Sequence, residues 1–328
     1  VAAYALRWRL DKDKKLRQRI LNLLKIVVSL GLLVILVTQV DVSQSIQYLT
    51  AMNWAPFLLA QVLYLGGVFV RAYRWGSLVW GLGLEVSWWR LVGLYFVGSF
   101  FSLVLPTGVG GDVVRMFELS QDSRQTAAAI SSVLVDRFLG LFVLFALALL
   151  ALAIGGYEMV SYQVRIVIGL AFVGCVIGVA LLLQRTWIES WGRRLGVDKL
   201  LGRIKILSEL YQSIHLYGYA ALLRATAASL VFNLLLIVTN YLLGLAVGID
   251  LSIWYYFLFI PIISALLMVP SIGGLGVREA GYVFLFGQAG VPSQQGLALA
   301  LAFDMTLLLA GLIGAILYII EGVRGMRS

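Results

Sequence analysis

Apolar segments about as long as a lipid bilayer is thick recur along the whole of this chain. A transmembrane helix needs about 20 consecutive, mainly apolar residues. Segments of this kind cover residues 20–40, 54–70, 126–154, 164–183, 220–247 and 297–320. The composition agrees, because 61% of the 328 residues are hydrophobic and 12% are charged, with a mean hydropathy of +0.96. The pattern predicts an all-α polytopic membrane protein with about six full spans.

Two shorter apolar segments, 91–105 and 253–268, run into breaks that are rich in proline and glycine. Lipid-exposed backbone must satisfy its own hydrogen bonds, so breaks of this kind occur only inside protein or beside a polar cavity. Each break is therefore predicted to be the tip of a re-entrant hairpin, with return arms at 113–124 and 277–287. The break residues are Pro106, Gly108, Gly110 and Gly111 in the first hairpin, and Pro270, Gly273, Gly274 and Gly276 in the second.

The distribution of basic residues favours hairpins over full crossings. If every apolar segment crossed the membrane, the basic segment 185–219 would lie outside. If 90–124 and 253–290 are hairpins instead, 22 of the 25 basic residues lie inside, Arg165 lies outside, and Arg137 and Arg278 are embedded. The positive-inside rule favours this second arrangement, which places both termini in the cytoplasm. The formal charge of +9 is then explained by basic residues that face anionic lipid headgroups, and no nucleic-acid partner is predicted.

The two predicted hairpins open from opposite sides of the membrane. A shift of 164 residues lays Pro106 on Pro270 and Gly110 on Gly274. Hairpin–span units of opposite orientation form an inverted repeat, an arrangement typical of alternating-access transporters. The predicted organisation is a basic N-terminus at 1–19 and a single transmembrane domain at 20–328. The halves of this domain cover about 20–154 and 164–320, and an amphipathic basic connector covers 185–217.

Seven ionisable residues in or beside the apolar segments are candidates for substrate binding. A charge at membrane depth is costly and marks a functional site by default. Each break leads into a helix whose first amides lack partners and favour an anion, and arginine binds phosphate as a planar fork. The seven residues are Asp112, Arg115, Asp136, Arg137, Arg278, Glu279 and Asp304.

Structural roles are open for several of these residues. Asp112 is expected to be the N-cap of its helix, with Arg115 on the same helix face, and Glu279 also suits a cap. Asp136 and Asp304 suit ion pairs between spans. Arg71 and Arg74, next to Tyr73 and Trp75, are interpreted as an interfacial anchor at the end of the second span.

No catalytic machinery is predicted. The chain has one histidine, His215, and one cysteine, Cys175, which excludes a histidine-based metal cluster and an intrachain disulfide. It has neither a nucleotide-binding loop nor a serine-nucleophile elbow. We therefore expect no metal, no cofactor and no enzymatic activity.

Three elements of the sequence together resemble a known family. They are Leu105-Pro106…Gly111-Asp112-Val113-Val114-Arg115, Asp136-Arg137-Phe138-Leu139-Gly140-Leu141 and Pro270…Gly273-Gly274-Leu275-Gly276-Val277-Arg278-Glu279. From about residue 20 to residue 320, the chain resembles the flippase-like lysylphosphatidylglycerol synthase transmembrane-domain family, which includes the membrane part of the bacterial multiple peptide resistance factor. The resemblance implies lipid translocation in a prokaryotic cell membrane, with Asp112, Arg137, Arg278 and Glu279 as functional groups. The resistance factor also has a cytosolic aminoacyl-transferase domain, whereas this chain stops at Ser328 and resembles the stand-alone members.

The predicted function is flipping or scrambling of a phospholipid or polyprenyl-linked lipid, whose headgroup is held by embedded arginine and acidic residues. One alternative is a proton-coupled transporter of a small polar or anionic solute, with Asp304 or Glu279 as the proton carrier. Two others are an enzyme acting on a lipid phosphate and an accessory subunit of a lipid-modifying enzyme. The expected partners are membrane lipids and a lipid-modifying enzyme or glycosyltransferase, and small-residue faces permit a homodimer.

Overall fold

The computed structural model describes residues 38, 40–105, 110–183, 213, 216–267 and 274–325. The predicted N-terminus 1–19, nearly all of the predicted span 20–40 and connector 185–217, and the hairpin tips 106–109 and 268–273 lie outside the described residues. Over the described ranges the chain is helical and has no β-strand. The elements are α2 (Val42–Thr50), α3 (Trp54–Gly81), α4 (Trp88–Val104), α5 (Gly110–Ser123), α6 (Thr126–Ala151), the π-helical turn η1 (Leu152–Gly156), α7 (Tyr162–Leu183), α11 (Tyr219–Ala246), α12 (Ile253–Leu266), α13 (Val277–Gln288) and α14 (Ser293–Gly325).

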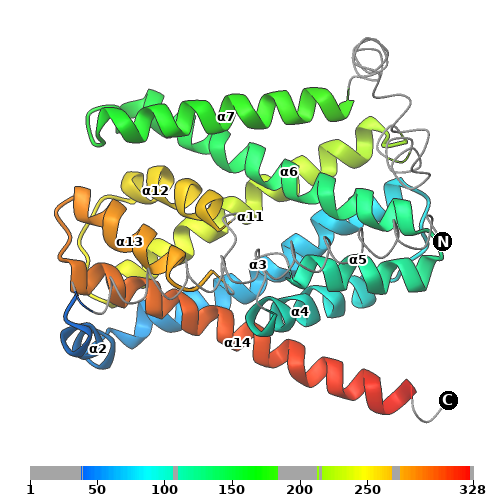
Figure 1. Ribbon diagram of the computed structural model, residues 1–328, viewed down its shortest axis with the longest axis horizontal. Helices are drawn as coiled ribbons and strands as arrows, with labels where there is room; N and C mark the ends of the chain where they lie inside the picture. The colour runs from blue at the N-terminus through cyan, green and yellow to red at the C-terminus, as the bar shows by residue number, and fades with distance from the viewer. Residues whose placement is uncertain are drawn as a thin grey trace, which may run out of the picture.

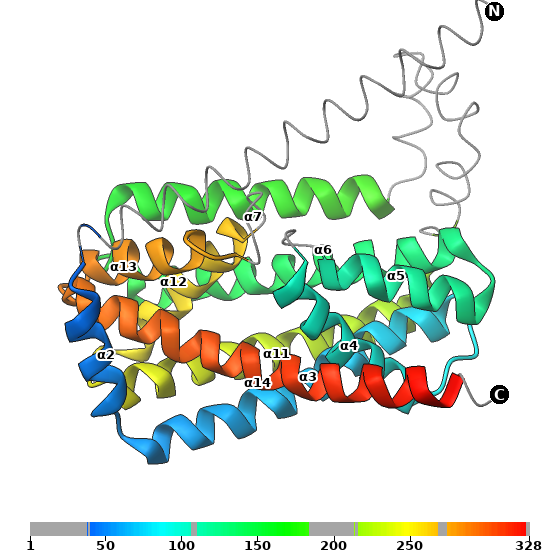
Figure 2. The same ribbon diagram turned by 60° about the horizontal axis from the view of Figure 1, so that its bottom comes forward.

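Four of these helices are long and apolar enough to cross a membrane: α3, α6 with η1, α11 and α14. They run lengthwise through the molecule (Figures 1 and 2). Shorter apolar helices are formed by α4, by α12 and by Tyr162–Gly178 of α7. The all-α polytopic class is confirmed, and the predicted span 20–40 is almost entirely outside the described residues.

The two predicted hairpins correspond to the helix pairs α4–α5 and α12–α13. In each pair the two helices pack against one another, and the pairs lie towards opposite ends of the molecule (Figure 1). The helices α5, α12 and α13 have 14, 14 and 12 residues, fewer than the roughly 20 that a full crossing needs. They are therefore suited to entering the bilayer without crossing it.

The spans that follow the hairpins each contact both hairpins. Helix α14 packs on α13 near its start, where Gly296 faces Val283, and on α4 near its end, where Gly314 faces the Phe96 carbonyl. Helix α6 likewise packs on both α5 and α12. The 164-residue shift relates the two sets of helices in order. When 164 is added to the first residue number of α4, α5 or α6, the result lies within three positions of the first residue of α12, α13 or α14, respectively. Each span thus joins its own hairpin to the other one.

The second span is longer than predicted. Helix α3 begins at the cap Asn53, whose side chain accepts a hydrogen bond of 3.1 Å from the Ala55 N–H, and it continues to Gly81. The prediction ended this span at residue 70 and placed Arg71 and Arg74 at the interface. This interpretation was wrong, because ten helical residues follow Arg71 and Arg74 is buried.

A short helix, α2, lies in the polar segment between the predicted spans 20–40 and 54–70. The side chain of Asp41 accepts a hydrogen bond of 3.0 Å from the Gln44 N–H and so caps α2. Helix α2 packs against α14. The helix was not predicted because the segment is polar. Its one buried residue is Ser45.

Glycines set the geometry beside both hairpin tips. Gly111 of α5 lies so close to α4 that a Cβ atom there would overlap the carbonyl oxygen of Gly98. Gly274 and Gly276 have φ angles of 84° and 81°, which side-chain-bearing residues adopt only at a cost. Gly110 and Gly111 lie in the first turn of α5 and not in non-helical backbone. The other predicted break residues, Pro106, Gly108, Pro270 and Gly273, lie outside the described residues.

Candidate functional site

Asp136 is the centre of a buried polar cluster on α6. Its Oδ1 atom accepts a hydrogen bond of 2.6 Å from Nε of Arg74 on α3, and its Oδ2 atom accepts one of 2.8 Å from the Tyr95 hydroxyl on α4. Nη1 of Arg115 on α5 lies 3.7 Å from the same Oδ2 atom. The Asp136 residue is fully buried, so the helices surround this carboxylate completely. The ion pair with Arg74 agrees with the structural alternative for Asp136.

Asp112 extends the cluster towards the outside of the bundle. It forms an ion pair with Arg115, three residues later on α5, and its Oδ2 atom lies 2.5 Å from Nε of Arg137 on α6. The side chain of Arg137 is 43% exposed, whereas that of Arg115 is 2% exposed. Asp112 is not the predicted N-cap, because α5 begins two residues earlier at Gly110. The predicted proximity of Asp112 and Arg115 is confirmed.

The two carboxylates and three arginines form one chain of alternating charge, which we call the first charged centre. Its order is Arg74, Asp136, Arg115, Asp112 and Arg137. Asp136 and Arg137 are neighbours in sequence, but their side chains diverge towards α3 and α5. The chain of charges runs from the core to a partly exposed guanidinium, so a ligand can reach one end of it.

Aromatic rings line the buried end of the first charged centre. The guanidinium carbon of Arg115 lies 4.1 Å from the Tyr95 ring centroid and 4.9 Å from that of Trp75. The Trp75 indole N–H donates a hydrogen bond of 3.0 Å to Ser132. Cation–π contacts of this kind compensate part of the desolvation of a buried guanidinium.

The second charged centre lies where α13 meets α14. Arg278 forms an ion pair with Asp304 of α14, and Oε2 of Glu279 accepts a hydrogen bond of 2.6 Å from the Gly276 N–H. Arg278 and Glu279 therefore bind different partners, as their adjacent positions on a helix predict. Glu279 also lies within electrostatic range of Asp304. One arginine here faces two carboxylates, and Glu279 does cap its own helix.

The start of α13 differs from the predicted anion site in one respect. Its first amides were expected to be available to a phosphate, but three of them already have acceptors within the chain. The Gly276 N–H donates to Glu279, and the N–H groups of Arg278 and Ala280 donate to the carbonyls of Gly274 and Gly276. Fewer amides than predicted therefore remain for an anion at this position, and the guanidinium of Arg278 is a further group there that could recognise one.

The seven candidate residues thus form two centres, with Asp112, Arg115, Asp136 and Arg137 in one and Arg278, Glu279 and Asp304 in the other. The prediction missed Arg74 and Tyr95, and it counted only two embedded arginines, whereas Arg74 and Arg115 are also buried. A signal for Arg74 was present, because the apolar pattern resumes after it at Leu78 and Val79. An arginine followed by further apolar residues lies within a helix and not at its end.

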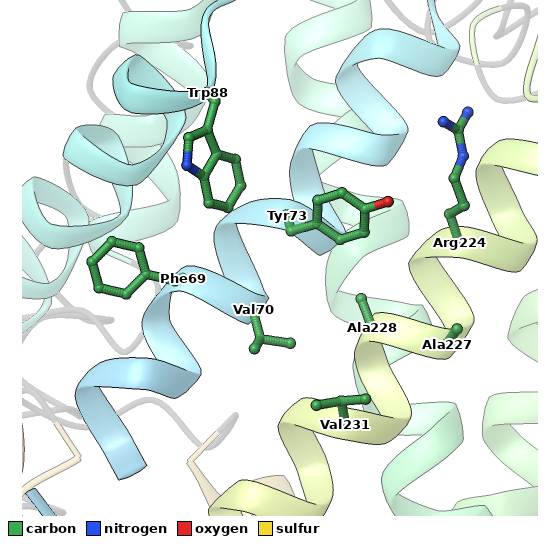
Figure 3. Close-up of a pocket in the computed structure, with 8 residues that line it drawn as sticks. All are labelled: Phe69, Val70, Tyr73, Trp88, Arg224, Ala227, Ala228 and Val231. Atoms are coloured by element: carbon green, nitrogen blue, oxygen red, sulfur yellow. The ribbon is translucent and has the colours of Figure 1, made fainter. Parts of the chain in front are cut away.

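A groove of about 550 Å³ lies on a different surface, between α3 and α11. Figure 3 shows three α3 side chains opposite four from α11, with Trp88 at one end. Its lining contains one charged residue, Arg224, and none of the seven candidates. The lining residues are Phe69, Val70, Tyr73, Trp88, Arg224, Ala227, Ala228 and Val231.

The sequence matches a family that is consistent with this arrangement. The model of the lysylphosphatidylglycerol synthase TM region matches residues 22–314. A UPF0104 membrane protein of Pyrococcus horikoshii is 22% identical over 193 residues, which make up 58% of this chain and 56% of that relative. The alignment thus spans little more than half of the relative's length. Because the family match covers both hairpins and both charged centres, the chain belongs to the lysylphosphatidylglycerol synthase transmembrane-region family.

Proposed function

We propose that this protein moves a phosphate-bearing lipid between the leaflets of the membrane, and that its two charged centres bind the headgroup on the way. The family supports a role with membrane lipids, because it is named after the synthase of one, lysylphosphatidylglycerol. The chain acts by binding and moving the lipid, without chemical change to it.

The first charged centre, together with Arg71 beside it, is the observation that carries this proposal. Four arginines, at positions 71, 74, 115 and 137, lie in this region and share neighbours such as Tyr95 and the two aspartates. In the described part of the chain, their ion pairs involve only two carboxylates, those of Asp112 and Asp136. An excess of positive charge in a low-dielectric interior favours an anion. Arginine in particular suits phosphate, since its planar fork can donate two parallel hydrogen bonds.

The second charged centre has the opposite balance. Arg278 faces two carboxylates, Glu279 and Asp304. A headgroup that carries an amine as well as a phosphate could therefore place the phosphate near the arginines and the amine near these acids. This complementarity favours zwitterionic or aminoacylated headgroups among the phosphate-bearing lipids.

Translocation in proteoliposomes tests the proposal. Vesicles contain a trace of fluorescent phosphatidylglycerol, phosphatidylethanolamine or polyprenyl phosphate, and a membrane-impermeant quencher reports the fraction in the outer leaflet. We expect wild type to transfer at least one of these lipids, and Arg278→Gln to transfer it at least about tenfold more slowly, since one charge-assisted hydrogen bond contributes roughly 1.5–3 kcal/mol.

Arg224→Gln is the matched control, because Arg224 is exposed at the groove and belongs to neither centre. It should leave the transfer rate unchanged. Wild-type protein that transfers none of the three lipids, in vesicles where its insertion has been verified, would contradict the proposal.

The closeness of Glu279 and Asp304 favours a second candidate, proton-coupled transport of a small anionic solute. Two carboxylates within electrostatic range of each other can share a proton, because both cannot ionise without repulsion. Uptake of a soluble organic anion driven by a pH gradient, without any movement of lipid, would favour this candidate over the first.

A further inference from the structure

Arg71 is an arginine inside a spanning helix that pairs with no acidic side chain of the residues the structure describes. It lies ten residues before the end of α3, or about 15 Å along the helix axis at 1.5 Å per residue. Its Nε atom is shielded from solvent and makes no hydrogen bond. No salt bridge joins Arg71 to a carboxylate of the described residues, and the hairpin tips 106–109 and 268–273 contain no Asp or Glu. None of the described carboxylates therefore neutralises its charge through an ion pair.

The immediate neighbours of Arg71 are aromatic. Its guanidinium carbon lies 5.0 Å from the ring centroids of both Tyr95 on α4 and Phe232 on α11. The Tyr64 side chain, two turns earlier on α3, also interacts with it. Cation–π contacts of this type contribute roughly 0.5–2 kcal/mol each, so they offset some of the cost of placing the charge at membrane depth without supplying an opposite charge.

The same two tyrosines link Arg71 to both charged centres. The Tyr95 ring is shared with Arg115 of the first centre, at 4.1 Å from its guanidinium carbon. Tyr64 lies within electrostatic range of both Arg71 and Arg278 of the second centre. Arg71 thus shares one aromatic neighbour with the first centre and interacts with a tyrosine that is also within electrostatic range of the second.

Arg74 provides an internal comparison. It lies one turn further along α3 and also approaches Phe232, with its guanidinium carbon 5.8 Å from that ring centroid. Arg74 is buried and paired with Asp136, whereas Arg71 is only partly buried and has no carboxylate partner in the described ranges. The first arrangement suits a structural ion pair, and the second leaves a cation accessible to an external anion.

Given the proposed lipid translocation, we infer that Arg71 binds the phosphate of the lipid headgroup between the two charged centres. The aromatic rings of Tyr95 and Phe232 hold the guanidinium in place while its accessible nitrogens face the phosphate. This role adds a binding residue to the two centres and links them into one path.

Binding to purified protein in detergent tests the inference without requiring transport. The probes are dihexanoyl phosphatidylglycerol and glycerol 3-phosphate, and the readout is the ligand-dependent rise in melting temperature, from which an apparent Kd follows. We expect Arg71→Met to bind the lipid probe about 10- to 100-fold more weakly than wild type, as for the loss of one charge-assisted hydrogen bond. Arg224→Gln should bind it like wild type.

The melting temperature measured without ligand distinguishes a binding role of Arg71 from a structural one. Replacing a cation that has no ion pair with an apolar side chain leaves no opposite charge uncompensated, whereas removing one partner of a buried ion pair does and is strongly destabilising. The melting temperature of Arg71→Met should therefore equal or exceed that of wild type, and that of Arg74→Met should fall. An Arg71→Met variant that melts lower while keeping wild-type affinity would show a structural cation and overturn the inference.

The remaining outcomes are also decisive. If phosphatidylglycerol does not stabilise wild type even at millimolar concentration, the inference is wrong. If glycerol 3-phosphate binds as tightly as the lipid, and Arg71→Met weakens both, Arg71 recognises phosphate but the ligand is soluble.

If wild type transfers lipid and Arg71→Met transfers and binds it equally well, the inference fails and the proposed function stands. If binding depends on Arg71 but no lipid is transferred, the proposed function fails and the phosphate site stands.

Discussion

Arg74 and Asp136 form an ion pair in the middle of the helix bundle, with 2.6 Å between Nε and Oδ1 and both side chains at most 5% exposed. The two residues are 62 positions apart, on α3 and α6. Each supplies an opposite charge to a group that is costly to bury at membrane depth. The pair therefore fixes the relative position of two spanning helices next to the first hairpin.

Removal of either partner of this pair should destabilise the protein more than removal of both. Arg74→Met leaves Asp136 without its strongest partner, and Asp136→Leu leaves Arg74 without a carboxylate, each at a cost of about 3–5 kcal/mol. The double variant should recover most of that loss. The free energy of unfolding in mild detergent, measured for the four proteins, gives the coupling directly. Single losses that simply add in the double variant would mean that the two side chains act independently.

This pair also shows where inference from the sequence reached its limit. Hydropathy predicted that Asp136 is an embedded charge. Its partner Arg74 lies 62 residues away, and their contact depends on how α3 and α6 pack, which a local sequence pattern does not show. The two arginines of α3 resembled the positively charged end of a span, and only the helix continuing to Gly81 shows that they lie within it. Local patterns were more reliable for the arms of the hairpins, because the short apolar segments and the segments after the breaks do form the helix pairs α4–α5 and α12–α13. The i, i+3 spacing also predicted the contact of Asp112 with Arg115.

Arg137 should matter more for transport than for stability. Its side chain is 43% exposed and shares Asp112 with the buried Arg115, so its loss should cost only about 0.2–1 kcal/mol of unfolding free energy. As the accessible end of the first charged centre, it should meet the headgroup first. We expect Arg137→Gln to slow lipid transfer at least about tenfold, as measured in the quenching assay.

Arg90→Gln is a suitable control for Arg137→Gln. Arg90 is also a partly exposed arginine that binds acids of α5, with 2.9 Å to Glu118 and 2.8 Å to Asp122. Because Arg90 belongs to neither charged centre, the variant should transfer lipid at the wild-type rate. Equal slowing in both variants would show that general weakening of the hairpin, and not the site, sets the rate.

Gly111→Ala should separate the two arms of the first hairpin. The added methyl group would overlap the carbonyl oxygen of Gly98 and the Ser102 hydroxyl, and overpacking of this kind costs about 1–3 kcal/mol. Asp112 is the next residue, so displacement of α5 should also disturb its ion pairs with Arg115 and Arg137. Both the melting temperature and the transfer rate are expected to fall. Gly174→Ala is the matched control, since no atom lies within 4 Å of the added methyl group, and an equal fall in that variant would contradict the packing argument.

Glu279 and Asp304 should differ in how they affect the pH dependence of transport. Asp304 is neutralised by its ion pair with Arg278, whereas Glu279 accepts its hydrogen bond from a backbone N–H and is the better placed of the two to exchange a proton. Glutamine retains an oxygen that can accept the same bond, so Glu279→Gln removes the titration while the cap of α13 stays in place. Lipid transfer measured over a series of pH values should therefore lose its pH dependence in Glu279→Gln. In Asp304→Asn the rate should fall at every pH while the shape of the profile is kept, because Arg278 loses its counter-ion. A Glu279→Gln profile that follows the wild-type curve would assign the proton exchange to another group.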